Sequence, residues 1–127
     1  MSTRRVLLVD DHQDTTDAVG LMLGLHGYNV LAADNSTDAM RLAQEHQPCL
    51  ILLDLTMPSD GGIAFRQQQL AHPELSRIPC VCVSGRTDAP EVARQLGIDT
   101  CFIKPVDFAD LLRAVEAHCA FVTPATA

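Results

Sequence analysis

Residues 49 to 54 are CLILLD, a run of five apolar residues that ends in an aspartate. An apolar run without polar alternation is typical of a strand that is buried on both faces of a parallel sheet. Four other short apolar runs occur along the chain, namely RVLLV (5–9), NVLAA (29–33), PCVCVS (79–84) and CFI (101–103). We therefore expect five strands, with the 49–53 strand at the centre of the sheet.

The segments between these runs have the pattern of helices. The clearest helix follows a plausible N-cap, Asp107, and has apolar residues at the helical period: Phe108, Leu111, Leu112, Val115 and Cys119. Start and stop residues indicate three more: 14–26 followed by Gly27, a helix capped by Ser36 that ends before Pro48, and one that begins at Asp88 and Pro90 and is closed by Gly97. The segment 62–70 has the weakest helical pattern.

Five strands that alternate with five helices predict an α/β fold of (βα)5 type. Because the crossovers between parallel strands are right-handed, this pattern gives a doubly wound parallel five-stranded sheet with helices on both faces. Ligands of such sheets bind at the carboxyl ends of the strands. The residues directly after each strand are therefore the candidates for function.

Composition and charge narrow the class of protein. The chain has 127 residues, which fits one domain, and we expect that domain to span residues 1–121, with 122–127 a short tail or the start of a linker. A net charge of −7 argues against nucleic-acid binding by this chain. The apolar runs are too short to cross a bilayer, so we expect no membrane contact and a cytoplasmic location.

The five cysteines are predicted to be buried free thiols. They are Cys49, Cys80, Cys82, Cys101 and Cys119, and they lie within apolar segments. Their number is odd and no CxxC occurs, which disfavours a disulfide framework or a zinc site. Free cysteine behaves as a small apolar residue, which fits these positions.

Polar residues follow four of the five strands at the edge where ligands bind. They are Asp10 and Asp11, Asp54, Ser84 and Gly85, and Lys104, the only lysine of the chain. Carboxylates about 4 Å apart repel by roughly 4 kcal/mol per pair at an effective dielectric of about 20. One lysine offsets one charge, and an all-oxygen site favours Mg²⁺, with Mn²⁺ possible, for the remainder.

These residue types suit phosphoryl transfer. A carboxylate is a nucleophile toward phosphorus, and Asp54 is the candidate because it ends a central apolar strand alone. Asp10 and Asp11 are suited to holding the metal ion. Lys104 and the Ser84 hydroxyl would stabilise the phosphoryl oxygens, and Gly85 would leave room for the group.

At these residues the chain resembles the response-regulator receiver domains of two-component signalling. The motifs are VLLVDD (6–11), LILLDLTMP (50–58) followed by Gly62, CVSG (82–85) and IKP (103–105). The resemblance covers residues 4 to about 121. It implies a flavodoxin-like sheet with strand order 2-1-3-4-5, and a cis bond between Lys104 and Pro105.

The resemblance also implies roles for the residues. Asp54 would accept a phosphoryl group from a sensor histidine kinase or a histidine phosphotransfer protein, and Lys104 and Ser84 would contact it. Mg²⁺ would be bound by Asp11, Asp54 and the Thr56 backbone carbonyl, with Asp10 acting through water. Thr56 and Arg86 would tune the lifetime of the phosphoryl group. A downstream protein would bind the face formed by the fourth and fifth helices and the last strand, and the chain would not be an enzyme on external substrates.

One position departs from the receiver pattern. Receivers usually have Tyr or Phe three residues before the lysine, as a switch that turns inward with Ser84, and here that residue is Cys101. Phe102 should point to the opposite face and fill the core, unless a bulge shifts the strand. His12, after the acidic pair, is expected to be a solvent-facing loop residue.

Two alternatives to the phosphoacceptor therefore stay open. Because of Cys101, the chain could be a receiver-fold interaction module that signals without phosphorylation or by a non-standard switch. A metal-dependent phosphatase would share the aspartate nucleophile, but no cap domain or substrate segment is present for it.

Overall fold

The computed structural model describes residues 4–119, apart from the side chain of residue 60. Within this range the strands are β1 (Arg5–Val9), β2 (Asn29–Ala33), β3 (Leu50–Leu53), β4 (Cys80–Ser84) and β5 (Cys101–Ile103). The helices are α1 (Gln13–Leu25), α2 (Ser36–His46), α3 (Gly61–Ala71), α4 (Ala89–Gln95) and α5 (Phe108–His118), with a short 3₁₀ turn at Pro58–Asp60.

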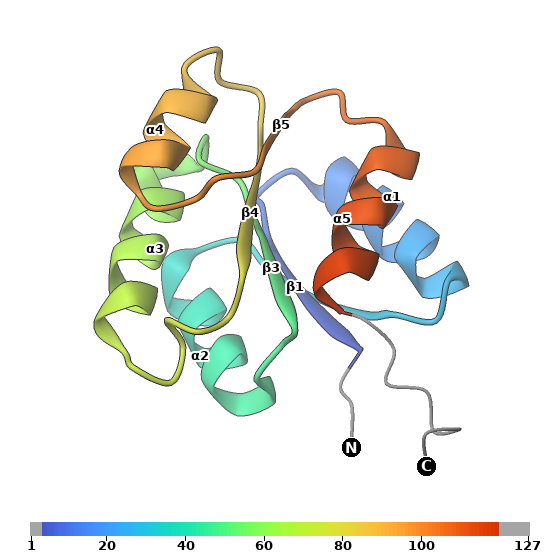
Figure 1. Ribbon diagram of the computed structural model, residues 1–127, viewed down its shortest axis with the longest axis horizontal. Helices are drawn as coiled ribbons and strands as arrows, with labels where there is room; N and C mark the ends of the chain where they lie inside the picture. Colours follow the sequence, from blue (N-terminus) through green and yellow to red (C-terminus); the bar gives the residue numbers. More distant parts are fainter. Residues whose placement is uncertain (1–3, 120–127) are drawn as a thin grey trace.

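The strands form one parallel sheet with the order β2-β1-β3-β4-β5, as Figure 1 shows. The order and the (βα)5 pattern confirm the predicted fold. All four residues of β3 are buried, whereas the edge strands β2 and β5 are partly exposed. The uninterrupted apolar run from residue 50 to 53 is therefore explained by contact with helices on both of its faces.

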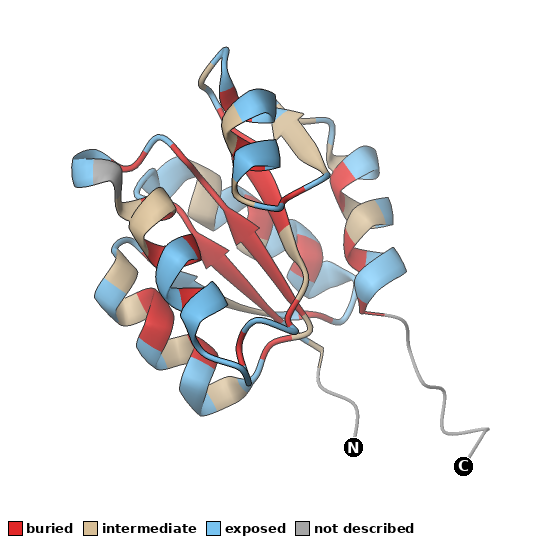
Figure 2. Ribbon diagram, turned by 60° about the vertical axis from the view of Figure 1, so that its left-hand side comes forward, coloured by how far each residue is buried: buried red, intermediate tan, exposed pale blue. Residues whose placement is uncertain are grey.

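Alternate residues of the strands pack into two separate cores. Leu7 and Val9 face α2, α3 and α4, whereas Val6 and Leu8 face α1 and α5. Figure 1 shows the two groups of helices on opposite sides of the sheet, and Figure 2 shows the buried strands between them. This double covering buries the sheet and leaves the two ends of its strands accessible.

Most of the predicted helix ends have the terminating or capping residues that the sequence indicates. Gly27 and Gly97 have left-handed φ angles of 89° and 76° after α1 and α4. The Asp107 carboxylate caps α5 by accepting a hydrogen bond from the Ala109 amide at 2.8 Å. The expected cap of α2 is wrong by one residue, because Asn35 is the N-cap and Ser36 is the first helical residue. Asn35 accepts a hydrogen bond from the Asp38 amide, which Ser36 cannot reach from inside the helix.

Helix α3 has a weak sequence pattern because its buried face includes polar residues. Arg66 and Gln69 are buried beside Phe65. The Gln69 amide nitrogen donates to the carbonyl oxygens of Leu75 and Ile78 at 2.9 and 3.0 Å. Arg66 donates to the Gln69 oxygen at 2.8 Å and to the Leu96 carbonyl, at the end of α4, at 3.0 Å. This network ties α3 to the segment before β4 and to α4.

The prediction of buried free thiols is wrong for Cys49 and Cys119, which are not free, and Cys80 and Cys101 are free but only partly buried. Cys49 and Cys119 are joined by a disulfide with a Cα–Cα distance of 5.4 Å, whereas Cys80, Cys82 and Cys101 are free. The apolar surroundings were predicted correctly, since Cys119 lies in the core beneath α1 and α5 and Cys49 packs against that core. The 70-residue separation of the pair hid its proximity, because only the fold brings the start of β3 to the end of α5.

None of the helices between residues 4 and 119 combines the length and the apolar character needed to cross a bilayer. The expected domain limits, residues 1–121, extend slightly beyond this range and stay a prediction. The expected tail at 122–127 lies outside the described residues.

Candidate functional site

The polar residues after the strands meet at one edge of the sheet, as the sequence predicted. They surround a pocket of about 650 Å³ whose lining includes Asp11, His12, Thr56, Gly85 and Lys104. Asp10 and Asp54 lie behind this lining and are 3% and 1% exposed. Since β1 and β3 are neighbours in the sheet, their last residues bring the two buried carboxylates side by side.

Lys104 connects the carboxylates of two strands. Its Nζ donates to Asp10 Oδ2 at 2.8 Å and to Asp54 Oδ2 at 3.3 Å. Burial alone would lower the pKa of Lys104, but the hydrogen bond and charge of Asp10 and the charge of Asp54 outweigh it and raise the pKa above its usual value. The lysine is therefore a fixed positive charge at the pocket. The peptide bond that follows it, to Pro105, is cis, as the receiver resemblance implied.

Asp54 is a buried carboxylate that stays ionised. Burial by itself would raise the pKa of Asp54. The Thr56 amide donates to Asp54 Oδ1 at 2.8 Å, and together with the charge of Lys104 this bond brings the pKa below its usual value. The second oxygen, Oδ2, is the one that faces Lys104. An anionic oxygen held beside a cation and an open pocket is arranged as a nucleophile.

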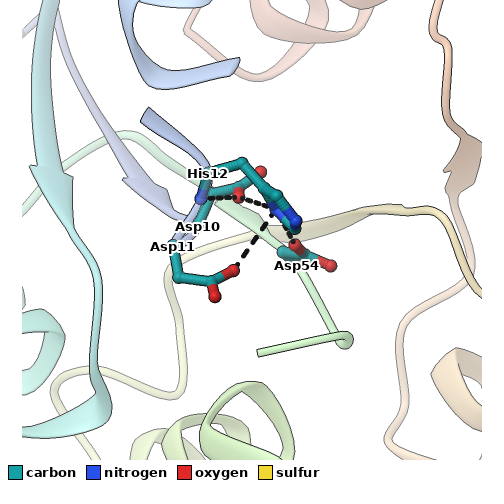
Figure 3. Close-up of side chains that lie close together, drawn as sticks. All are labelled: Asp10, Asp11, His12 and Asp54. Atoms are coloured by element: carbon teal, nitrogen blue, oxygen red, sulfur yellow. Dashed lines mark hydrogen bonds and ion pairs between the residues drawn. The ribbon is translucent and has the colours of Figure 1, made fainter. Parts of the chain in front are cut away.

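His12 lies closer to the acidic residues than the sequence suggested. Its side chain is 56% exposed, as expected of a loop residue, but Figure 3 shows its ring directed at three carboxylates. Nδ1 is 3.0 Å from Asp10 Oδ1, 3.3 Å from Asp11 Oδ1 and 3.5 Å from Asp54 Oδ2. The hydrogen bond to Asp10 is the main cause that raises the pKa of His12. Its position directly after the acidic pair was the signal that could have revealed this contact.

The donor set at this edge fits a divalent cation. Asp10, Asp11, His12 and Asp54 each offer one ligand atom, and these atoms lie within 4.8 Å of one another. The three carboxylates carry three negative charges, of which Lys104 balances one. Oxygen donors of this kind suit Mg²⁺ or Mn²⁺. The oxygen donors that suit such an ion are those of Asp10, Asp11 and Asp54, the carboxylates that the sequence predicted as metal ligands.

Ser84 is buried at the end of β4 and contacts Thr56. The two hydroxyl oxygens, Ser84 Oγ and Thr56 Oγ1, are 2.6 Å apart, and either can donate. Ser84 Oγ also accepts a hydrogen bond from the Arg86 amide at 3.2 Å. The Arg86 guanidinium pairs with Asp88 at 2.8 Å and does not line the pocket.

Two glycines near the site differ in the space that a side chain would have. Gly85 lines the pocket, and a Cβ there would meet no atom within 4 Å, so its predicted role of leaving room for a phosphoryl group stays a prediction. At Gly62, in the first turn of α3, a Cβ would lie 2.1 Å from the Asp54 carbonyl oxygen. Gly62 is therefore the glycine on which the position of the Asp54 backbone depends.

The side chains of β5, the strand directly before Lys104, point to the faces of the sheet that the sequence predicts. Cys101 packs with the core beneath α2, α3 and α4, and Phe102 packs with the core beneath α1 and α5. Cys82 pairs with Cys101 and Val83 with Phe102 in an unbroken register, so no bulge brings Phe102 to the position of Cys101. An aromatic ring is thus absent at that position of β5.

Comparison with known proteins gives one consistent family. The model of the family described as "Response regulator receiver domain" matches residues 6–116. The chain is 34% identical over 116 residues to the protein PilH of Pseudomonas aeruginosa, covering 89% of this chain and 95% of that one. It is 26% identical over 118 residues to the sporulation initiation phosphotransferase F of Bacillus subtilis, covering 93% and 95%.

Solved structures share the fold. A putative response regulator from Chloroflexus aurantiacus has a TM-score of 0.84 at 21% identity, covering 94% of this chain and all of that one. The receiver domain of a sensor histidine kinase from Pseudomonas aeruginosa, whose structure has a magnesium ion in its active-site cleft, has a TM-score of 0.82 at 24% identity, covering 94% and 100%.

Proposed function

Because this chain belongs to the family of response regulator receiver domains, we propose that it is a phosphoacceptor whose acceptor residue is Asp54. Receiver domains are signalling modules of two-component systems that interact with histidine kinases and phosphotransfer proteins. The observation that carries the proposal is the ionised, buried Asp54 carboxylate, whose Oδ2 lies 3.3 Å from the Lys104 ammonium at an open pocket.

The proposed reaction moves a phosphoryl group from a phosphohistidine of the partner to Asp54. A carboxylate oxygen of Asp54 forms a bond to phosphorus while the phosphorus–nitrogen bond breaks, and its electron pair stays on the histidine nitrogen. Lys104 stabilises the negative charge that is shared over the phosphoryl oxygens. The chain itself then carries the phosphoryl group, and its later loss to water needs no external substrate.

A bound Mg²⁺ would supply further positive charge to the phosphoryl oxygens. We propose that Asp11, Asp54 and the Thr56 backbone carbonyl hold it, and that Asp10 assists through water. Mn²⁺ would suit the same oxygen donors. The cluster of carboxylates within 4.8 Å of one another supports this assignment.

The proposed switch begins at Ser84. Its hydroxyl would turn from Thr56 Oγ1, now 2.6 Å away, toward a phosphoryl group on Asp54. Thr56, Gly85 and Arg86 would tune the lifetime of that group, with Arg86 acting from its pair with Asp88 rather than from inside the pocket. The change would reach a downstream protein through the face formed by α4, β5 and α5, and we expect this signalling in the cytoplasm.

A receiver-fold module that signals without phosphate is the second candidate, since Cys101 replaces the usual aromatic residue. The contact between Asp54 and Lys104 favours the phosphoacceptor, because a module without phosphate chemistry has no need of a buried ion pair. We therefore propose that Cys101 changes how the switch is read and not whether Asp54 is phosphorylated.

The test is to incubate the protein with acetyl phosphate and Mg²⁺ and to measure its intact mass in rapidly quenched samples. We expect one added phosphoryl group, which is lost in Asp54→Asn and kept in the control Asp99→Asn, whose aspartate is exposed and away from the pocket. An unchanged mass, or a phosphoryl group that persists in Asp54→Asn, would refute the assignment.

A further inference from the structure

The disulfide lies at the amino-terminal ends of the strands, whereas Asp54 lies at their carboxyl-terminal ends. Cys49 directly precedes β3 and Cys119 directly follows α5, so the bond fastens the end of that helix to the start of a central strand. Figure 1 shows the end of α5 at the same end of the molecule as the start of β1. The pair plays no part in the phosphoacceptor site.

One cysteine of the pair is partly exposed and the other is buried. Cys49 is partly exposed and lines a pocket of about 530 Å³, whereas Cys119 is 6% exposed and does not line it. Thiol–disulfide exchange requires an incoming thiolate to reach one sulfur of the bond. In this geometry that sulfur is Sγ of Cys49.

The pocket beside Cys49 has one cationic and one anionic side chain, together with a histidine. Its wall includes the side chains of Arg77 and His118, together with one carboxylate, Glu74. Arg77 and His118 are both exposed residues, so an incoming molecule meets them before it reaches the sulfur. A small thiol that has both a carboxylate group, for Arg77, and an ammonium group, for Glu74, is the class of molecule that this arrangement favours.

The structure can also accommodate Cys49 and Cys119 as reduced thiols. Sγ of Cys49 lies 3.3 Å from the Arg5 carbonyl oxygen, which can accept a hydrogen bond from the thiol once the disulfide is opened. Cys119 is surrounded by apolar residues, and a neutral thiol is tolerated there as a small apolar group. Neither state therefore leaves a buried polar group without a partner at Cys49 or Cys119.

The three remaining cysteines differ from this pair. Burial raises the pKa of the Cys80 thiol to about 12, and burial together with a hydrogen bond between the Cys82 and Cys101 thiols raises the pKa of Cys82. The thiolate is the reactive form of cysteine, so Cys80 and Cys82 are poor partners for exchange. Neither Cys80, Cys82 nor Cys101 lines the pocket beside Cys49.

We propose that Cys49 and Cys119 form a reversible thiol–disulfide site that reacts with a small thiol carrying carboxylate and ammonium groups, such as glutathione, and holds the end of α5 only when oxidised. The incoming thiolate bonds to Sγ of Cys49, the sulfur–sulfur bond breaks, and its electron pair goes to Cys119, which takes up a proton. A second thiolate then attacks the mixed disulfide and releases Cys49. The two molecules of thiol are oxidised to their disulfide, and the reverse sequence closes the bond again.

Helix α5 is the element that the reaction frees. Within α5, Leu111 and Val115 are buried, and Phe108 and Leu112 pack against the same core. The disulfide adds a covalent attachment directly after the last residue of the helix. When the bond opens, amides in the last turn of α5 should exchange with solvent faster, while those of α2, on the other face, should not change. The proposal is independent of phosphorylation at Asp54.

The test begins with air-oxidised, full-length protein that is alkylated with iodoacetamide in denaturant and digested without reductant. We expect a linked peptide that joins Cys49 to Cys119, and alkylation at Cys80, Cys82 and Cys101. The protein is then equilibrated with mixtures of reduced and oxidised glutathione. The intact mass should show one transition between disulfide and dithiol.

Two variants locate the reactive sulfur. Cys119→Ala should trap glutathione on Cys49, and the matched variant Cys49→Ala should take up little glutathione on the buried Cys119. Reduced wild-type protein, which has an unchanged sequence, should show exchange in the last turn of α5 that is about tenfold faster than in oxidised protein. Five alkylated cysteines after treatment with oxidised glutathione, a glutathione adduct mainly on Cys80 or Cys101, or unchanged exchange in α5 would each overturn the proposal.

Discussion

Gly62 is the residue at which the packing of α3 and the position of the Asp54 backbone depend most directly on each other. The first turn of α3 lies so close to the Asp54 backbone that a Cβ at this position would be 2.1 Å from the carbonyl oxygen. Either α3 or the Asp54 carbonyl must move to make room. Because the Asp54 side chain is attached to that backbone, packing and chemistry are coupled here.

We therefore expect Gly62→Ala to lower the free energy of unfolding by about 1–3 kcal/mol, the usual cost of overpacking. Chemical denaturation measures this change, and acetyl phosphate labelling of Asp54 should fall in parallel. Gly85→Ala is the matched control, since a Cβ there has open space. Equal stability of the two variants would contradict this account of Gly62.

Asp54 should also determine part of the response to acid. Although burial opposes ionisation, the Thr56 amide and Lys104 bring the pKa of Asp54 below the usual value for an aspartate. A folded-state pKa below the unfolded one contributes stability that is present above the unfolded value and is lost as the pH falls through the folded value.

The melting temperature should consequently fall below pH of about 4 more steeply in the wild type than in Asp54→Asn. Thermal unfolding followed by circular dichroism over a pH series gives this comparison. Asp99→Asn should follow the wild-type curve, because it removes an exposed carboxyl group outside the site. A wild-type slope that Asp54→Asn leaves unchanged would show that another group dominates.

The site could be predicted from sequence to the extent that its residues directly follow strands. Asp10, Asp11, Asp54, Ser84 and Lys104 were identified in this way, since parallel strands end at a common edge. Contacts made by flexible side chains were not predictable. The His12 ring turns back from an exposed loop toward three carboxylates, and the Arg86 side chain turns away from the pocket to Asp88.

At the scale of elements, α3 is held by hydrogen bonds that its sequence pattern does not suggest. Gln69 is fully buried and satisfies two carbonyl groups, those of Leu75 and Ile78, while Arg66 connects it to the end of α4. A helix whose buried face includes Arg and Gln has a weak apolar period. This composition is why α3 had the weakest signal of the five helices in the described range.

Gln69→Ala should leave the Leu75 and Ile78 carbonyl groups and the Arg66 guanidinium with fewer partners. Each buried polar group without a partner costs about 1–3 kcal/mol, so we expect a loss in that range or above it. Urea denaturation of the variant tests this expectation. Gln67→Ala, an exposed change in the same helix, should have little effect, and an equal loss in both would disprove the role of the network.

Strands were easier to predict than helix ends. The observed β3 begins one residue after the predicted 49–53 run, and β1, β2 and β5 have the predicted bounds. Burial of these strands requires apolar side chains, so the strands are easy to find in the sequence. At the start of α2, Asn35 and Ser36 are both good capping residues, and the local sequence did not distinguish them.

At the scale of the whole molecule, the disulfide is the feature that no local pattern could predict. Odd cysteine number and apolar surroundings indicated free thiols, and these signals are correct for Cys80, Cys82 and Cys101. The bond depends on the doubly wound topology, which returns α5 to the amino ends of the strands. Long-range proximity of this kind follows from the fold and not from spacing.

Reduction of this bond should lower the free energy of unfolding by about 4 kcal/mol, as the chain-entropy model gives for a loop of this length. Denaturation of the wild type with and without a strong reductant measures the difference. Cys49→Ala should match the reduced protein and should no longer respond to reductant. A stability that reductant does not alter would indicate that the bond contributes nothing to the folded state.

The burial of β3 has a consequence for how the two ends of the molecule communicate. This strand begins beside Cys49 and ends beside Asp54, and its four residues are fully buried between β1 and β4. A strand clamped on both edges and both faces does not slide when one of its ends is released. We therefore expect β3 to insulate Asp54 from the proposed redox change at Cys49, while α5, which the disulfide attaches at that end of the strands, responds to it.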